Sequence, residues 1–240
     1  MRVSVEFLPR GPYPDVVLLV DVLRASTSIA LLFERGAREV WVTPSLRVAR
    51  ELEADLALGE REGIPPEGFF GSTSPSEILG MNLSNKRVVY TSENLPGALR
   101  AVKEAPRVYL AAFVNARAAV ETALRTAREA VTVVAAGHRG REALDDALAA
   151  GFLAKKLLRA QTEPVPDDGT RIATALLKAY PDPQEALWAS ESGQLLVSRG
   201  FTEDLAQASV IGRTSRVPFL AGYREVRGQP VFTLLADEPA

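Results

Sequence analysis

The sequence predicts an α/β fold: a mostly parallel, mixed sheet with helices on both faces, followed by a helical C-terminal third. Short runs of branched aliphatic residues alternate with amphipathic stretches through the first two thirds of the chain. The run at 16–22 is apolar apart from Asp21, as in strands that parallel sheets bury on both faces. Repeated strand–helix units place helices on both faces of such a sheet.

The same alternation sets the order of the expected elements. Strands are expected at 16–22, 39–42, 87–90, 108–113, 131–136, 216–220 and 230–235. Helices are expected at 25–35, 45–58, 96–104, 116–129, 142–160, 170–179, 184–189, 190–199 and 203–209. Ser45 is expected to cap the helix that follows it, and Gly36 to end the helix that precedes it.

Two stretches interrupt this rhythm. Residues 59–85 are dominated by Gly, Pro, Ser and Asn, and a loop of this length in a compact domain is usually functional or disordered. The gap at 162–169 is the best place for a subdivision of the chain. The C-terminal helices are too short to bury a core of their own, so residues 1–240 are expected to form one domain.

The composition excludes several classes of protein. Basic and acidic residues number 28 and 30, and no run of like charge stands out, so neither nucleic acid nor a membrane is an expected partner. The absence of cysteine excludes disulfides, thiolate catalysis and Cys-ligated zinc. The N-terminus lacks a signal-peptide core and no apolar run could span a bilayer, so a cytoplasmic protein is expected. A homodimer is the default expectation for such a protein.

Candidate site residues follow the predicted strands, because ligands of open α/β sheets bind beyond the carboxyl ends of the strands. The candidates are Asp21, Arg24, Ser26, Thr27, Gly59, Glu60, Arg61, Gly71, Ser72, Thr73, Ser74, Thr91, Ser92, Glu93, Asn94, Asn115, Gly137, His138, Arg139, Gly140, Asp145 and Asp146. They are expected to converge on one edge of the sheet.

The chemistry of these residues favours an anionic substrate and a cation. Arginine presents a planar fork of donors that matches phosphate or sulfonate oxygens, and Gly- and Ser-rich loops supply backbone N–H groups to an anion. Asp21, Glu60 and Asp146 are hard oxygen ligands of the kind that Mg²⁺ prefers. A phosphoryl-transfer site needs both functions, so the sequence favours this reaction class.

Each residue also has a structural interpretation. Asp21 or Ser26 could cap a helix, Arg61 could lie in an exposed turn, and Asp145 and Asp146 would suit the N-terminus of a helix. The single histidine, His138, is either structural or an acid or base.

Several familiar catalytic motifs are absent. The chain has no phosphate-binding P-loop, no dinucleotide fingerprint, no G-x-S-x-G elbow and no H-E-x-x-H zinc motif. A haloacid dehalogenase site is disfavoured because Leu23 stands where that D-x-D motif has its second acid.

Seven segments in order resemble one family, that of 2-phosphosulfolactate phosphatase, an enzyme of coenzyme M biosynthesis in archaea with many bacterial relatives. These segments are VVLLVDVLRASTSIALLFERGAREV, LALGEREGIPPEGF, GSTSPSEI, VVYTSENLPGAL, AAFVNARAAV, VVAAGHRGREALDDALAAGFLA and SGQLLVSRGFTEDLAQAS. GSTSP lacks the asparagine of the family motif, and TSENLPG lacks its Gly-Thr. The segments that would contact the substrate therefore depart from the pattern more than the charged residues do.

The resemblance implies a three-layer α/β/α enzyme that uses Mg²⁺ to hydrolyse a small sulfonated phosphate ester to 3-sulfolactate and phosphate. The implied catalytic residues are Asp21, Arg24, Glu60, Arg61 and Asp146, with Asp21, Glu60 and Asp146 as Mg²⁺ ligands. The predicted substrate-binding residues are Ser26, Thr27, Ser74, Thr91, Asn94, Asn115, Gly137 and Gly140. Hydrolysis by metal-activated water and by an acidic nucleophile both remain open.

Three alternatives to this function also remain. The first is a phosphatase for a different small phosphorylated carboxylate, and the second is an anion-binding member of the family that has lost catalysis. The third is a structural α/β domain whose acids are helix caps. Phosphate release from a panel of esters would separate them.

Overall fold

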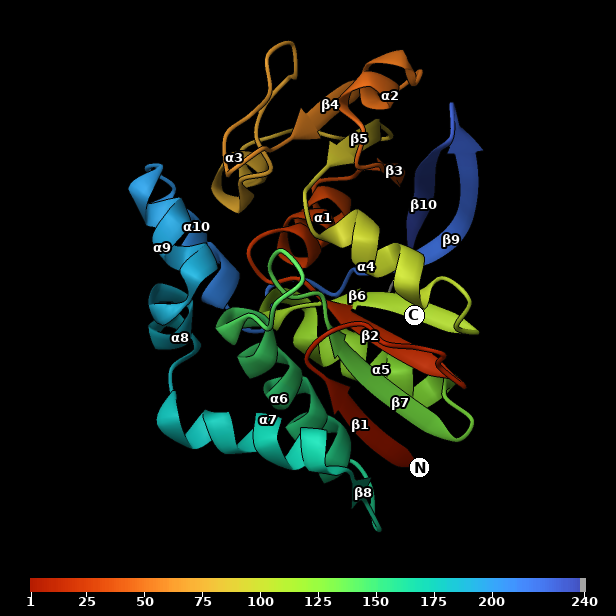
Figure 1. Ribbon diagram of the computed structural model, residues 1–240, viewed down its shortest axis with the longest axis vertical. Helices are drawn as coiled ribbons and strands as arrows, with labels where there is room; N and C mark the ends of the chain where they lie inside the picture. The colour runs from red at the N-terminus through yellow and green to blue at the C-terminus, as the bar shows by residue number, and fades with distance from the viewer. Residues whose placement is uncertain (238–240) are drawn as a thin grey trace.

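The sheet is the framework of the molecule (Figure 1), which we describe from a computed structural model that covers residues 1–237. Within those residues, ten strands form one mixed sheet in the order β4-β5-β3-β10-β9-β6-β2-β7-β1-β8. The strands are β1 (Arg2–Glu6), β2 (Val16–Val20), β3 (Glu39–Val42), β4 (Leu56–Gly59), β5 (Arg87–Thr91), β6 (Arg107–Ala111), β7 (Ala130–Ala135), β8 (Val165–Pro166), β9 (Val217–Val226) and β10 (Gln229–Asp237). The predicted α/β class is confirmed.

Helices cover both faces of this sheet, as expected for a three-layer fold. The helices are α1 (Ala25–Glu34), α2 (Leu46–Glu51), α3 (Pro75–Leu79), α4 (Leu95–Val102), α5 (Ala116–Thr126), α6 (Leu144–Arg159), α7 (Asp168–Ala179), α8 (Pro183–Ala189), α9 (Glu191–Ser198) and α10 (Thr202–Ser209), with a 3₁₀ turn η1 (Phe113–Asn115). The helical C-terminal third is confirmed for 168–209, and the β9–β10 hairpin follows it.

Strand β2 shows why the apolar pattern predicted a sheet buried on both faces. Val16, Leu18 and Val20 pack into one core, which α5, α6 and the C-terminal helices cover. Val17 and Leu19 point the other way, into the core that α1 and α4 cover. Successive side chains of a strand point to opposite faces, so an unbroken apolar run fills two cores at once.

The sheet consists of two parallel halves. In one half β6, β2, β7, β1 and β8 run parallel, and in the other β3, β5 and β4 do. The hairpin β9–β10 joins the halves, and each of its three pairings, with β6, within itself and with β3, is antiparallel. Three reversals leave the two halves running in opposite senses.

Several elements differ from the prediction. The helix predicted at 45–58 is wrong beyond residue 51, because Leu56–Gly59 forms strand β4 and pairs with β5. Strand β1 was not expected, and the long loop contains a short helix, α3, capped by Ser74. Ser45 caps α2 as predicted, by accepting a hydrogen bond from the Val48 N–H.

The predicted subdivision lies at the edge of the sheet. Within 162–169 the strand β8 pairs with β1, so this stretch is held by backbone hydrogen bonds on the first half. That residues 1–240 form one domain stays a prediction. No helix within residues 1–237 is long and apolar enough to cross a membrane.

Candidate active site

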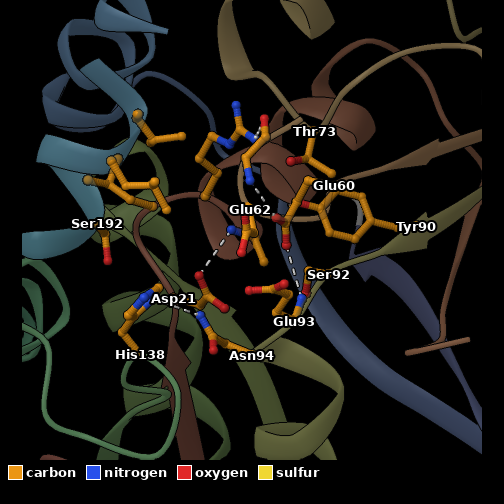
Figure 2. Close-up of a pocket in the computed structure, with 16 residues that line it drawn as sticks. Asp21, Glu60, Glu62, Thr73, Tyr90, Ser92, Glu93, Asn94, His138 and Ser192 are labelled. Carbon is orange, nitrogen blue, oxygen red and sulfur yellow. Dashed lines mark hydrogen bonds between the residues drawn. The ribbon is translucent and has the colours of Figure 1, made fainter. Parts of the chain in front are cut away.

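A cleft opens beside the ends of β2, β4, β5 and β7 (Figure 2). Its lining residues are Asp21, Leu23, Arg24, Ala25, Glu60, Glu62, Gly63, Thr73, Tyr90, Ser92, Glu93, Asn94, His138, Ser192, Leu195 and Leu196. These residues come from both halves of the sheet, with helix α9 forming one wall. The expectation of convergence on a single edge is therefore corrected: two halves of opposite sense bring their carboxyl ends to one cleft.

Asp21 directly follows β2 and points into the cleft from a buried position. Its Oδ1 accepts the Ala25 N–H at 3.2 Å, and its own N–H donates to Ser26 Oγ at 3.0 Å. Its Oδ2 accepts no hydrogen bond from the described residues. The two interpretations of Asp21 are compatible, because one oxygen fixes the start of α1 while the other faces the cleft.

Burial, together with the charges of Asp145 and Glu60, raises the pKa of Asp21 to about 7 against the lowering effects of the Ala25 N–H and Arg24. A carboxyl with a pKa near neutrality can take up and return a proton at neutral pH. Asp21 therefore has the properties that an acid–base group needs.

A pair of buried acids lies behind Asp21, at the start of α6. Asp146 Oδ1 accepts the Val22 N–H at 2.7 Å and its Oδ2 accepts the Gly137 N–H at 3.0 Å. Burial and the neighbouring charges of Asp145 and Asp21 raise the pKa of Asp146. Asp146 thus ties together the loops that follow β2 and β7, and it does not line the cleft.

Asp145 is also buried, and its Oδ1 has no hydrogen-bond partner among the described residues. Burial raises its pKa to about 6. Like Asp146, it lies outside the cleft lining.

Glu60 faces the cleft from the end of β4 and organises two loops around it. Its Oε2 accepts the Gly63 N–H and its Oε1 accepts the Glu93 N–H, both at 3.0 Å. Gly59 precedes it, and a Cβ there would lie 2.3 Å from Thr91 Oγ1. Glycine is required at this position because β4 approaches β5 closely where Glu60 enters the cleft.

The guanidinium of Arg24 is buried and already paired. Its Nη1 donates to Asp204 Oδ2 at 2.8 Å and its Nη2 to the Gly63 carbonyl at 3.0 Å, while the group lies 4.7 Å from the Phe201 ring centre. Asp204 also accepts hydrogen bonds from Ser74 Oγ, Ser76 N–H and Ser76 Oγ. Arg24 lines the cleft, but each of its terminal nitrogens already donates a hydrogen bond to another protein group.

Arg61 turns away from the cleft. Its guanidinium donates to the carbonyl oxygens of Glu60 and Pro44, and it does not belong to the lining. The structure therefore brings Asp21, Arg24 and Glu60 to the cleft and leaves Arg61 and Asp146 bracing its loops. A catalytic role for those two stays a prediction.

Most of the predicted substrate-binding hydroxyls bond inside the protein. Ser26 Oγ donates to the Leu19 carbonyl and Thr27 Oγ1 to the Val22 carbonyl. Ser74 Oγ donates to Asp204, as noted above. Thr91 Oγ1 is buried and has no partner among the described residues, yet the side chain lies beside the lining rather than in it.

Two hydroxyls line the cleft where the sequence had predicted those of Ser74 and Thr91, and each belongs to the residue next to the predicted one in the chain. Thr73 and Ser92 both line the cleft, and the described residues offer no partner to Thr73 Oγ1 or Ser92 Oγ. A buried hydroxyl without a partner is costly unless a ligand or water completes its bonding. The sequence had no signal to separate adjacent hydroxyls, because strand ends are uncertain by a residue or two.

The loop after β7 carries the remaining polar groups. His138 lines the cleft, with its Nδ1 3.4 Å from Asn94 Nδ2, and Asn94 Oδ1 accepts the Arg139 N–H at 3.1 Å. Arg139 and Gly140 have φ values of +52° and +77°, which form a tight two-residue turn between His138 and Arg141. Gly137, at φ +74°, could not carry a Cβ, since one would lie 2.4 Å from the Arg141 carbonyl oxygen.

Asn115 is fully buried away from the cleft. Its Oδ1 accepts the Ala112 N–H at 2.9 Å, and its Nδ2 donates to the carbonyls of Leu110 and Arg216, both at 3.1 Å. Two of these bonds hold Asn115 to the end of β6, and the third joins it to Arg216, just before β9. Substrate binding by Asn115 stays a prediction, but its bonds are those of a structural residue.

The cleft is rich in carboxylates. Asp21, Glu60, Glu62 and Glu93 line it, against the single guanidinium of Arg24, and Figure 2 shows several of these acids turned towards the same space. Within 1–237, no three His, Cys, Asp or Glu side chains gather closely enough to hold a metal ion by themselves. Mg²⁺ commonly takes one or two protein carboxylates and completes its shell with water and substrate phosphate. Asp21, with its unbonded Oδ2, and Glu60 beside it fit that kind of site.

Comparisons with known proteins agree along nearly the whole chain. The model of a family described as 2-phosphosulpholactate phosphatase matches residues 3–222, a range that contains every residue of the cleft. A protein of Deinococcus radiodurans named "Probable 2-phosphosulfolactate phosphatase" is 41% identical over 225 residues, covering 92% of this chain and 93% of that protein. Proteins of the same name from Thermus thermophilus and Parasynechococcus marenigrum are 39% and 34% identical, covering 92% and 82% of this chain and 95% and 85% of their own.

Proposed function

The chain belongs to the 2-phosphosulpholactate phosphatase family, and from this we propose that its cleft hydrolyses 2-phosphosulfolactate to 3-sulfolactate and phosphate. One observation in the cleft supports this most directly. The hydroxyls of Thr73 and Ser92 are buried, have no partner among the described residues and line the same cleft as Asp21. Hydroxyl donors that lack an acceptor suit the oxygens of a bound phosphate.

We propose Mg²⁺ as the cofactor because the cleft is acidic. A phosphate ester entering a space lined by four carboxylates meets repulsion unless a cation reduces the negative charge. When bound, Mg²⁺ would neutralise the phosphate oxygens and polarise the phosphorus centre. Asp21 and Glu60 would hold it, and Asp146 stays a candidate ligand outside the cleft lining. Each oxygen of Glu60 and of Asp146 accepts one backbone hydrogen bond and keeps a lone pair for a cation.

The roles of the chain's own groups follow from their positions. Thr73 and Ser92 donate to the phosphoryl oxygens, and Asp21 either takes the proton of an attacking water or attacks the phosphorus itself. The amide of Asn94 donates to His138 Nδ1, which leaves the proton on Nε2. His138 therefore can donate a hydrogen bond from Nε2 to the leaving oxygen at the mouth of the cleft.

The test is a metal-dependent phosphatase assay on the purified protein. Phosphate release should be fastest with 2-phosphosulfolactate, slower with phosphate esters of other three-carbon acids, and lost in EDTA. A faster reaction with an unsulfonated phosphorylated carboxylate would favour the alternative substrate class. Binding of these esters without turnover would favour an anion-binding protein. The coenzyme M pathway and a cytoplasmic location, both predicted from the sequence, belong to the same proposal.

A further inference from the structure

The proposed substrate carries two acidic groups besides its phosphate. Its carboxylate is on the carbon that bears the phosphate, and its sulfonate is on the next carbon, so the sulfonate lies further from the phosphorus. Thr73 and Ser92 are buried, so a phosphate bound to their hydroxyls leaves the far end of the ester, with its sulfonate, towards the mouth of the cleft. An anion placed there in an acidic cleft needs a cation at the mouth.

The two arginines that the sequence singled out do not provide that cation. Arg24 gives both terminal nitrogens to Asp204 and Gly63, and Arg61 gives both of its own to backbone carbonyls. Arg24 is almost fully buried and its charge is already balanced by Asp204, so it adds no net positive charge at the mouth of the cleft.

Arg139 stands at the mouth instead. A shallow hollow beside the cleft shares Glu93 and Asn94 with it, and Arg139 belongs to the wall of that hollow. The tight turn at 138–141 and the bond from the Arg139 N–H to Asn94 Oδ1 hold its backbone in place. Its side chain is 52% exposed, so an incoming anion can reach it.

The present partners of Arg139 are easily exchanged. Its Nη2 lies 3.4 Å from Glu93 Oε2 and 3.7 Å from Glu62 Oε1, and exposed pairs of this kind contribute little to stability. Glu62 keeps a second cation, Arg199, at 3.3 Å, and is therefore not left unpaired when Arg139 moves. Arginine's planar fork can then meet two sulfonate oxygens.

Resting on the function proposed above, we infer that Arg139 binds the sulfonate end of the substrate and selects sulfonated over unsulfonated esters. The test compares kcat and KM for 2-phosphosulfolactate and 2-phospholactate, which lacks only the sulfonate. In Arg139→Ala, KM for the sulfonated ester should rise about 10- to 100-fold more than KM for the unsulfonated ester, as expected for losing a charge-assisted pair. Arg139→Lys should recover part of the difference, because it keeps the charge without the fork.

Arg141 provides a matched control on the same turn. It is exposed, pairs with Glu191 at 3.2 Å and borders neither the cleft nor the hollow. Arg141→Ala should leave the ratio of the two KM values as it is in the parent protein. Equal changes for both esters in Arg139→Ala, or the same change of ratio in Arg141→Ala, would overturn the inference.

A binding measurement separates this inference from the reaction itself. Calorimetry with 3-sulfolactate and lactate needs no turnover, and the parent protein should prefer 3-sulfolactate while Arg139→Ala should lose that preference. Absence of turnover in the parent protein with this preference intact would reject the proposed reaction and keep the sulfonate site. If the parent protein turns over the ester but Arg139→Ala changes neither the kinetic preference for the sulfonated ester nor the binding preference for 3-sulfolactate, the proposed reaction stands and the sulfonate site is rejected.

Discussion

The folded protein disfavours the ionised form of Asp21, which lowers the free energy of unfolding at neutral pH. Burial raises its pKa from 3.8 to about 7, so the folded state resists an ionisation that the unfolded chain undergoes freely. Below about pH 4 the carboxyl is protonated in both states and no penalty exists. As the pH rises from about 4 to about 7 the unfolded state becomes charged first, and the folded state loses stability across that window.

Asp21→Asn should therefore stabilise the protein at pH 8 while abolishing most activity. A pKa raised from 3.8 to about 7 corresponds to at most about 4 kcal/mol, and coupling to Asp145 and Glu60 makes about 1–4 kcal/mol the expected range. Thermal unfolding in EDTA at pH 8 and pH 4 measures it, with the gain present at pH 8 and absent at pH 4.

Asp15 offers a control of opposite sign. Burial acts to raise its pKa, but the N–H groups of Arg128, Glu129 and Ala130 outweigh that effect and hold the pKa below its ordinary value. Asp15→Asn should then destabilise the protein at neutral pH, and the loss should fade as the pH falls through the lowered pKa. If both variants changed stability in the same direction at pH 8, the account of Asp21 would fail.

The sequence predicted some site residues better than others, for reasons of side-chain length. Asp21, Glu60 and Asn94 have short or moderately long side chains at the ends of strands, so the strand places them in or beside the cleft. Arg24 and Arg61 follow strands too, but a long flexible side chain can choose among distant partners. The partner of Arg24 lies 180 residues further along the chain, and no local pattern could have predicted it.

At the scale of elements, strands that are buried along their whole length were predicted reliably, whereas a short, half-buried strand was not. β2 and β7 are buried along their whole length, and each was predicted from a run of mostly aliphatic residues. β4 has only half its residues buried, and its leucine spacing fits a helix as well as a strand. Its identity as a strand depends on pairing with β5, which is a tertiary contact.

One side chain of helix α10, Asp204, connects this helix to the residues around the cleft. Its carboxylate accepts hydrogen bonds from Arg24 of the α1 start and from Ser74 and Ser76 of α3. The Arg24–Asp204 pair is almost fully buried, with side-chain exposures of 3% and 1%. Removing one partner of a buried pair leaves a charge without compensation.

Asp204→Asn should accordingly destabilise the protein by about 3–5 kcal/mol and raise KM through the loosened Arg24. Denaturant unfolding and steady-state kinetics measure the two effects. Glu203→Gln is the matched control, since Glu203 is the exposed neighbour on the same helix and bonds only to Gln207. If Asp204→Asn lost no more stability than Glu203→Gln, the Arg24–Asp204 pair would not be what stabilises the packing of α10.

For the whole molecule, the site depends on how the two halves of the sheet are joined. Asp21 comes from the half that contains β2, whereas Glu60 and Ser92 come from the half that contains β4 and β5. The sequence predicted the strands but not this arrangement, because the strand order results from pairings between segments far apart in the chain. The β9–β10 hairpin, at the C-terminal end of the chain, is what connects the halves.

A cation held between Asp21 and Glu60 would link the two halves, so Mg²⁺ should stabilise the fold as well as support the reaction. A ligand that binds only the folded state stabilises it by about 2.7 kcal/mol at 100 times its Kd. Thermal unfolding should therefore shift upwards with Mg²⁺ relative to EDTA, by an amount that grows with concentration.

The variants assign the ligands. Asp21→Asn should abolish the Mg²⁺ shift and Glu60→Gln should reduce it, while Glu121→Gln, an exposed acid on α5, should leave it intact. Asp146→Asn tests whether Asp146 is a metal ligand or a structural residue. If Asp146 binds Mg²⁺, the variant should show a smaller Mg²⁺-induced shift in thermal unfolding. If Asp146 only holds the backbone N–H groups of Val22 and Gly137, the variant should lose the same stability with and without Mg²⁺. An unchanged Mg²⁺ shift in Asp21→Asn would mean that the cation binds elsewhere, and that the excess of carboxylates in the cleft is balanced in another way.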